Sequence, residues 1–421
     1  MIRWLHWGVP AGLFLIAFFH RTAPGVIAKD LMRAFDATGT LIGLLSSAYF
    51  YAYAGFMIPG GVLIDAYGVR RVVAAGGAVM ALGTVTMAVA TSTWPLFAGR
   101  FLVGMGATVT FVGVLKIASV WFPPRQFGTM SALTATVGIA GSLVATAPLA
   151  SLVTLTGWRR AFVVVSLVTL VASALCVWLV RDRPAGAAPE PAEASTLRGI
   201  TRGLLQVLGN RHTWPPFLAF FCLYSALGNL LLWSVPFLRD VYGLSTLSAA
   251  GYASAVSLAL LGAAPTTGYL SDRMQCRKRP YTLLSSGLAV LWIVLVLTLG
   301  SLPLWGVFAL LFGMGIFGAA FVLTWPIGRE VNPPHLAGVA VAVVNLGGFL
   351  GAALTQAPLG AILDARWSGA IVAGARAYPV DAYRAAFAVC AGLAVAALAL
   401  SPLLRETRAT NAYRSGGSPC A

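Results

Sequence analysis

The sequence predicts an all-α polytopic membrane protein, in which twelve transmembrane helices form two pseudo-symmetric six-helix bundles. The composition and the spacing of the apolar runs predict this class. The chain has 421 residues, of which 59% are apolar and only 10% are charged, and its mean hydropathy is +0.85. Soluble domains carry about 25% charged residues. The composition therefore excludes a cytosolic enzyme, a secreted disulfide scaffold and a disordered regulator.

Twelve apolar runs are long enough to cross a bilayer, which takes about 20 helical residues. They cover residues 7–28, 40–64, 72–90, 95–120, 128–155, 161–180, 214–239, 245–270, 281–299, 303–328, 336–363 and 385–404. The first run lacks a small-residue cleavage pattern, so we expect a retained span rather than a signal peptide. The long polar interruption after the sixth run predicts four parts: an N-terminal six-helix bundle (1–180), a cytoplasmic linker (181–213), a C-terminal six-helix bundle (214–404) and a cytoplasmic tail (405–421).

The basic residues predict the orientation. The net charge is +16, but the basic residues stand in short clusters between apolar runs, so we expect no nucleic-acid partner. With the N-terminus placed inside, seventeen Lys and Arg fall on the inner side and eight on the outer side. Both termini are therefore expected in the cytoplasm, and the membrane is expected to be a bacterial inner membrane. The five cysteines are scattered, so we expect no metal site and no cofactor.

A repeated loop motif supports the division into halves. Residues 61–71 read GVLIDAYGVRR after the second run, and residues 268–279 read GYLSDRMQCRKR after the eighth. The aspartates of the two copies, Asp65 and Asp272, are about half the chain apart. Parallel repeats of six helices are a transporter construction with the substrate site near the midplane, between the repeats.

These features together resemble the major facilitator superfamily. Its signature loop G-x-x-x-D-x-x-G-x-[RK]-[RK] matches residues 61–71, and residues 100–106, RFLVGMG, are similar to its fourth-helix Arg-Gly pattern. The resemblance implies a gate that clasps helix ends across the two halves, formed by Asp65, Gly68, Arg70, Arg71, Asp272, Arg273 and Arg277. Ala66 stands where the superfamily usually has Arg, so we expect a weaker clasp. We also expect a structural or gating role for Arg100.

Four further segments resemble the organic-anion branches of the superfamily, which include anion:cation symporters and organophosphate:phosphate exchangers. They are FHR at 19–21, SSAYFYAY at 46–53, WFPP at 121–124 and GWR at 157–159. In these branches a first-helix Arg at the position of Arg21 grips the anionic substrate. Several of the symporters bind the driving proton on two acidic residues, where this chain has His20 and Ala107. Their proton mechanism therefore does not transfer directly.

Arg21 is also singled out by electrostatics. All twelve acidic residues fall in loops or at span ends, whereas Arg21 lies deep in the first run. A charge near the bilayer centre costs about 2.5–3.5 kcal/mol on insertion scales, so it needs a polar partner. A planar guanidinium suits a carboxylate or phosphate through two parallel hydrogen bonds. We therefore expect an anionic ligand at Arg21, the alternative being a structural arginine bonded to helix carbonyls or a tyrosine.

Other candidates surround this position. His20 is expected to couple a proton to the substrate, because an arriving anion would favour its protonation; a neutral, packed histidine is the alternative. Residues that could complete the coordination of the anion, or instead hold helices together, are Tyr49, Tyr53, Tyr224, Asn229, Trp233, Trp325, Asn345 and Gln356. Lys116, at the inner end of the fourth run, could line the inner mouth.

The sequence thus predicts a secondary active transporter of a small organic anion: a carboxylate, sugar acid or phosphate ester. We expect alternating access with proton-coupled import; efflux of a metabolite, siderophore or drug is the alternative. The sequence has no catalytic constellation and no nucleotide-binding loop, so neither an enzyme nor a pump driven by ATP is expected. The expected partners are the anion, a proton or counter-ion and the lipid bilayer, and we expect a monomer.

Overall fold

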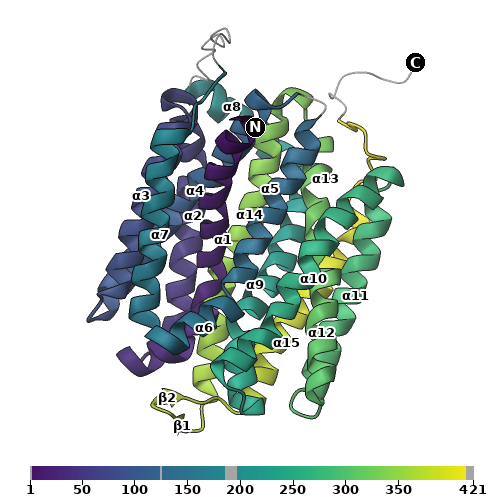
Figure 1. Cartoon of the computed structure of the whole chain (residues 1–421). Coiled ribbons are helices and arrows are strands. Elements are labelled where there is room, and N and C mark those ends of the chain that lie inside the picture. Colours follow the sequence, from purple (N-terminus) through teal and green to yellow (C-terminus); the bar gives the residue numbers. More distant parts are fainter. Residues whose placement is uncertain (1, 124–125, 185–196, 414–421) are drawn as a thin grey trace.

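The structure is a computed structural model that describes residues 2–123, 126–184 and 197–413. Within these ranges, twelve helical segments are long and apolar enough to span a membrane. Each of the twelve predicted runs corresponds to one of them, and they stand side by side as a single bundle (Figure 1). The predicted fold class is therefore confirmed.

The first half contains six spans built from seven helices. These are α1 (Ile2–Phe35), α2 (Gly39–Tyr67), α3 (Val69–Ala88), α4 (Thr93–Trp121), α5 (Phe127–Val144), α6 (Ala147–Thr156) and α7 (Trp158–Leu179). Helices α5 and α6 together form the fifth span, which is interrupted between Val144 and Ala147. Pro148 lies in the first turn of α6, where its missing N–H leaves no helix hydrogen bond unmade.

The second half has the same number of spans. It contains η2 (Arg211–Thr213), α9 (Trp214–Tyr242), α10 (Thr246–Arg273), α11 (Lys278–Thr298), α12 (Leu304–Gly318), η3 (Ala319–Leu323), α13 (Thr324–Glu330), η4 (Pro334–Leu336), α14 (Ala337–Ala365), α15 (Val380–Ala399) and η5 (Ser401–Leu403). The tenth span is made of α12, η3 and α13, so a 3₁₀ segment interrupts the α-helix midway.

Two short elements were not predicted from the sequence. The linker contains helix α8 (Leu197–Gly209), whose Val207 packs against Ala340 and Val343 of α14. A hairpin of β1 (Ile371–Val372) and β2 (Ala375–Arg376) connects α14 to α15. Its two turn residues have positive φ, as the tight turns of hairpins require. Residues 185–196 of the predicted linker and 414–421 of the predicted tail lie outside the described residues.

The two ends of the bundle are easily told apart. We call the end where α1 begins, and where the chain leaves α15, the terminal end; β1 and β2 mark the opposite, hairpin end (Figure 1). The halves meet most closely where α2 packs on α14. A side chain at Gly43 would collide with the backbone of Gln356, so the two helix backbones touch there.

Candidate functional site

Buried polar bonds join the two halves near the hairpin end. Lys29 of α1 forms an ion pair with Asp240 of α9, with 2.6 Å between Nζ and Oδ2. Both side chains are nearly inaccessible, at 4% and 6% exposure. The same carboxylate oxygen accepts from the Tyr383 hydroxyl at 2.8 Å, and Lys29 also donates to the carbonyl of Arg376. This cluster links α1 to three elements of the second half.

A second carboxylate caps a helix of the opposite half. Asp364 of α14 accepts from the backbone N–H groups of Gly39, at 2.9 Å, and Thr40, at 2.7 Å. These first N–H groups of α2 have no partner within their own helix, and they favour a negative charge. The Tyr378 hydroxyl donates to Asp364 at 2.7 Å. Burial and the Asp364 carboxylate raise the pKa of Tyr378, which therefore stays a donor at neutral pH.

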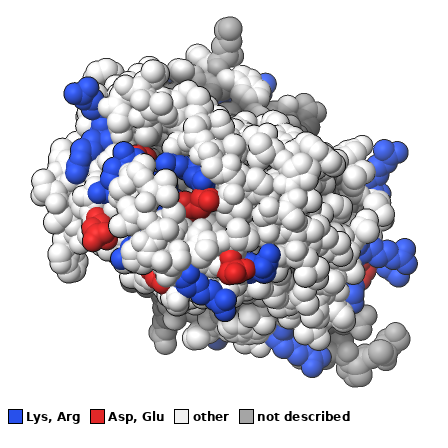
Figure 2. Space-filling model, turned by 90° about the horizontal axis from the view of Figure 1, so that it is seen from below, with Lys and Arg blue, Asp and Glu red and all other residues white. Residues whose placement is uncertain are grey.

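The hairpin end is also charged on its surface. Figure 2 shows this face, where basic and acidic side chains lie interspersed. Arg376 of β2 contributes to the seal, with its Nη1 3.6 Å from Asp364 and its guanidinium carbon 4.2 Å from the ring centre of Trp367. Two kinds of contact thus close this end across the halves: the Lys29–Asp240 pair and the bonds from the N–H groups of α2 to Asp364.

A cavity of about 570 Å³ lies between the halves on the other side of this seal. Its lining comes from α1, α2, α4 and α5 of the first half and from α9, α10, η3, α13 and α14 of the second. It extends to Tyr269, which is 62% exposed near the terminal end of α10. The volume is in the range of small-ligand sites, about 300–1,000 Å³. The cavity therefore offers a small molecule a site that is reached from the terminal end.

Arg21 enters this cavity from the middle of α1. Its Nε donates to the Tyr49 hydroxyl at 3.2 Å, and its Nη1 donates to the Tyr224 hydroxyl at 3.3 Å. No ion pair involves Arg21 among the described residues. A guanidinium has five N–H donors, so these two bonds leave N–H groups that a ligand can use. The charge predicted from the sequence thus lies between the halves with N–H donors that its bonds to Tyr49 and Tyr224 do not use.

Aromatic rings surround the guanidinium. Its central carbon lies 3.9 Å from the ring centre of Phe18, 4.8 Å from that of Phe349 and 4.9 Å from that of Tyr53. Such contacts attract a cation to the face of the ring. The Tyr53 and Phe349 rings, from opposite halves, are themselves only 4.3 Å apart. The charge is thus held in place by neutral groups, and an anion is still free to neutralise it.

Several predicted residues share this cavity with Arg21. Tyr53, Tyr224, Trp325 and Asn345 all line it. Tyr49 is fully buried behind Arg21 and donates its hydroxyl proton to the carbonyl of Ala17 at 3.1 Å.

Other predicted residues lie elsewhere. Asn229 is buried and donates to Thr355 of α14 at 2.8 Å, and Gln356 is buried close to the seam between α2 and α14. Trp233 is completely buried in α9. Lys116 pairs with Asp65. The structure does not bring these four side chains into the cavity lining.

His20 and Arg100 lie together inside the first half. The His20 ring is completely buried, with its Nε2 3.1 Å from the Thr84 hydroxyl. Arg100 is also completely buried, and its Nη1 donates to the His20 carbonyl at 2.8 Å. Its guanidinium carbon lies 5.1 Å from the ring centre of Tyr49. Tyr49 therefore contacts two arginines, and only Arg21 of the two lines the cavity.

The first copy of the loop motif makes contacts within its own half. Asp65 pairs with Lys116 of α4. Gly68 joins α2 to α3 with φ of 83°, a conformation that favours glycine. The backbone N–H of Arg70 donates to Asp182 at 2.7 Å, while the Arg70 and Arg71 side chains are exposed.

The second copy is more tightly bonded. Arg277 donates to Asp272 at 2.6 Å, to Ser271 at 2.9 Å and to the buried Glu330 at 2.9 Å. Glu406 accepts from the first backbone N–H groups of α11, and these bonds lower its pKa to about 2 despite partial burial.

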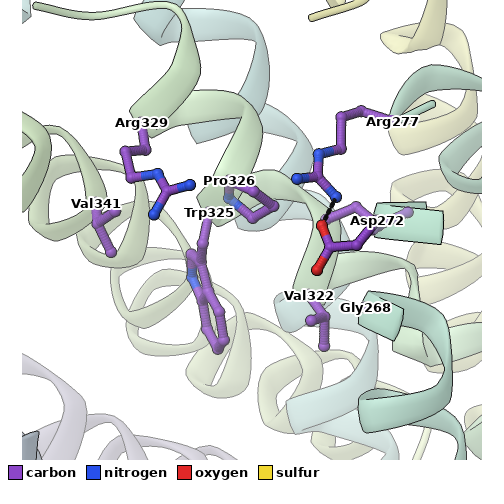
Figure 3. A pocket seen from close by; sticks show the side chains of 9 residues that line it. Gly268, Asp272, Arg277, Val322, Trp325, Pro326, Arg329 and Val341 are labelled. Atoms are coloured by element: carbon purple, nitrogen blue, oxygen red, sulfur yellow. Dashed lines mark hydrogen bonds and ion pairs between the residues drawn. The ribbon is translucent and has the colours of Figure 1, made fainter. Parts of the chain in front are cut away.

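The second copy also borders a smaller pocket of about 300 Å³. In Figure 3, Asp272 and Arg277 lie on one side of Trp325 and Arg329 on the other. Trp325 and Asp272 line both this pocket and the main cavity.

Sequence reasoning missed four acidic residues that hold these loops and the seal: Asp182, Glu330, Asp364 and Glu406. Each stands at the end of a span or just beyond it. The available signal was that a carboxylate at such a position can cap the start of another helix. The clasp across the halves remains a prediction, since the bonds of both motif copies described above lie within one half.

The comparisons with known proteins decide the family. The model of the Major Facilitator Superfamily matches residues 11–356. The chain belongs to this superfamily. The members of this superfamily and the relatives described below are transporters. The chain is therefore an integral membrane transporter and not an enzyme.

Curated relatives cover most of the chain at low identity. The "Uncharacterized transporter YybO" of Bacillus subtilis is 23% identical over 380 residues, which is 84% of this chain and 86% of the relative. The "Probable galactarate/D-glucarate transporter GarP" of Escherichia coli K12 is 23% identical over 83% of this chain and 85% of its own. The "Probable sulfoacetate transporter SauU" of Cupriavidus necator is 25% identical over 64% of this chain and 65% of its own.

Solved structures share the fold. A bacterial homolog of the human lysosomal transporter Spinster, in an inward-facing and unoccupied conformation, has a TM-score of 0.76 at 17% identity over 96% of this chain and 98% of its own. A D-xylose-proton symporter has a TM-score of 0.76 at 16% identity over 98% of this chain and 100% of its own. At this identity, these likenesses establish the architecture of the transporter and nothing about its substrate.

Proposed function

We propose that this transporter carries a small organic anion that binds Arg21 in the cavity between the halves. The observation that carries the proposal is a membrane-embedded guanidinium that lines the cavity without an ion-pair partner among the described residues, and whose bonds to Tyr49 and Tyr224 leave N–H donors over. A cation at this depth costs about 2.5–3.5 kcal/mol, which an anionic ligand offsets through charge-assisted hydrogen bonds. The names of two relatives support the proposal, because galactarate, glucarate and sulfoacetate are organic anions.

We further propose that the transporter works by alternating access and that its cavity faces the cytoplasm in this conformation. The excess of Lys and Arg in the loops on the side of the termini supports a cytoplasmic terminal end in a bacterial inner membrane. The cavity then communicates with the cytoplasm, and the seal made by Lys29, Asp240 and Asp364 faces outward. To accept substrate from outside, the protein must break these bonds and close the terminal end.

Proton-coupled import is the proposed mode, with His20 as the proton carrier that the sequence suggests. The imidazole is buried against Thr84 and has no place in the cavity lining. A proton on this ring would therefore not contact the anion. It would act indirectly, by shifting α1, which also carries Arg21 at the next position. Replacing His20 with Asn tests this point: proton-driven uptake should lose its dependence on pH, while binding of the anion persists.

The decisive experiment is a thermal-shift and binding screen of the purified full chain. The panel contains carboxylates, sugar acids and phosphate esters, with tetraethylammonium as a cationic probe. We expect at least one anion to bind, and Arg21→Gln and Arg21→Lys to weaken it tenfold or more, on the order expected for a bidentate pair. Arg384→Gln removes an exposed arginine that bonds Asp381 of its own helix and the Leu299 carbonyl, away from the cavity, and it should leave binding unchanged. Undiminished binding in both Arg21 variants, or a preference for the cation, overturns the proposal.

A further inference from the structure

We infer that the anion is an aromatic monocarboxylate, and not a polyhydroxylated sugar acid or a dicarboxylate. The inference rests on the proposed function, because it assumes that the anion binds Arg21. It concerns what surrounds the guanidinium: how many charges, which rings and how many free polar groups. These three properties of the cavity point to the same chemistry.

The first property is the number of charges. Among the described residues, only Arg21 and Asp272 bring a charged side chain to the cavity lining. Asp272 is already paired with Arg277, and its negative charge stands toward the terminal end of the cavity. Arg329 lies beyond Trp325, in the smaller pocket (Figure 3). A second carboxylate on the ligand would thus find no cation in the main cavity and would approach Asp272, so one negative charge fits best.

The second property is the aromatic character of the cavity wall. Ten of the lining residues are aromatic, and they come from both halves. Phe18 and Tyr53 face the guanidinium from the first half, and Phe349 faces it from the second. A carboxylate bound to the free N–H groups of Arg21 therefore has its substituent among these rings. A flat aromatic substituent can pack against them edge-on or offset, which adds to the burial of its apolar surface.

The third property is the scarcity of free hydrogen-bonding groups near Arg21. Tyr49 and Tyr224 already accept hydrogen bonds from it. The other uncharged polar groups in the described lining are few: the Asn345 amide, the Trp325 indole N–H, which has no partner among the described residues and can only donate, and the hydroxyls of Tyr53, Thr129, Ser131 and Thr136. Thr136 donates to the carbonyl of Ala132 in its own helix. A sugar acid would bring several hydroxyl groups into this space, and each hydroxyl that loses water without finding a partner weakens binding. An aromatic ring has no such requirement.

The test compares four probes on the purified full chain in lipid nanodiscs: phenylacetate, cyclohexylacetate, galactarate and benzyl alcohol. We expect phenylacetate to bind most tightly. Cyclohexylacetate, which has the same charge but a saturated ring, should bind about three- to tenfold more weakly because it lacks the ring–ring contacts. Galactarate should bind more weakly still, and benzyl alcohol, which lacks the charge, should not compete. The ratio of the first two probes isolates the aromatic contribution from that of Arg21.

Variants of the wall complete the test. Phe349→Leu and Phe18→Leu, one from each half, should each lower the preference for phenylacetate over cyclohexylacetate. Phe312→Leu is the matched control, because Phe312 stacks on the exposed Phe308 of α12 and does not line the cavity. Since the readout is a ratio measured on one sample, partial loss of folded protein does not affect it.

The outcomes separate the two proposals. If galactarate binds as tightly as phenylacetate, or if neither wall variant changes the ratio, the aromatic inference is overturned while the anion proposal stands. If no anion binds in a manner that depends on Arg21, the proposed function itself fails.

Discussion

The hairpin end and the terminal end use the same kinds of group in different ways. At the hairpin end, Asp240 and Asp364 accept hydrogen bonds from the opposite half and are largely buried. At the terminal end, Asp65 and Asp272 pair with cations of their own half and are more than half exposed. The two ends thus differ in the partners of their carboxylates. At the closed end the carboxylates bond the opposite half, and at the open end they bond their own half. A few bonds therefore distinguish a sealed end from an open one.

The largest effect is expected from breaking the buried pair at the hairpin end. Lys29→Met leaves Asp240 buried without its cation, which costs about 3–5 kcal/mol in comparable pairs. The sealed conformation should lose population to one that opens at the hairpin end. Spin labels on cysteines replacing the exposed Trp94 and Trp305, one in each half, should report a longer distance. An unchanged distance distribution would mean that the pair does not hold the seal.

A smaller effect is expected from removing the helix cap. Asp364→Ala leaves the first N–H groups of α2 without their acceptor and should destabilise the seal by about 1–3 kcal/mol. Asp364→Asn keeps an oxygen acceptor and should behave more like the parent protein. The same pair of spin labels measures both variants. Equal behaviour of the Ala and Asn variants would show that the cap does not contribute.

The smallest effect is expected at the terminal end. Asp65→Asn removes a pair whose two side chains are 56% and 32% exposed, and such pairs contribute about 0–1 kcal/mol. The melting temperature of the purified protein and the distance at the hairpin end should barely change. A destabilisation as large as that of Lys29→Met would contradict the contrast between the two ends.

The fold was predictable because its signal is local. Span length and hydropathy are properties of short stretches, and all twelve runs appear as helices. The interhalf bonds were not predictable, since the partners of Lys29 and Asp364 are distant in the sequence and chosen by packing. The hairpin was missed because its strands are only two residues long. Helix α8 was missed although its apolar residues Ile200, Leu204 and Val207 recur at helical spacing, because we interpreted the whole polar stretch between the halves as a linker.

The sequence predicted how deep in the membrane the site residues lie, but not which way their side chains point around each helix. The depth of Arg21 followed from its position in the first run, and the structure has it between the halves. His20 precedes it by one residue, which turns it about 100° around the helix and into the first half. Asn229 follows Tyr224 by five residues, so it points about 140° away from the cavity side of α9. Without a known facing direction, sequence alone could not separate Tyr224 from Asn229.

The hydrogen bond from Arg21 to Tyr224 connects the two halves directly. Arg21 belongs to the first half and Tyr224 to the second, so this bond links the two halves near the middle of α1. A ligand that takes over this guanidinium nitrogen releases the link. The proposed anion and Tyr224 would then compete for the same N–H group, so binding of the anion would weaken the link that opposes movement of one half against the other.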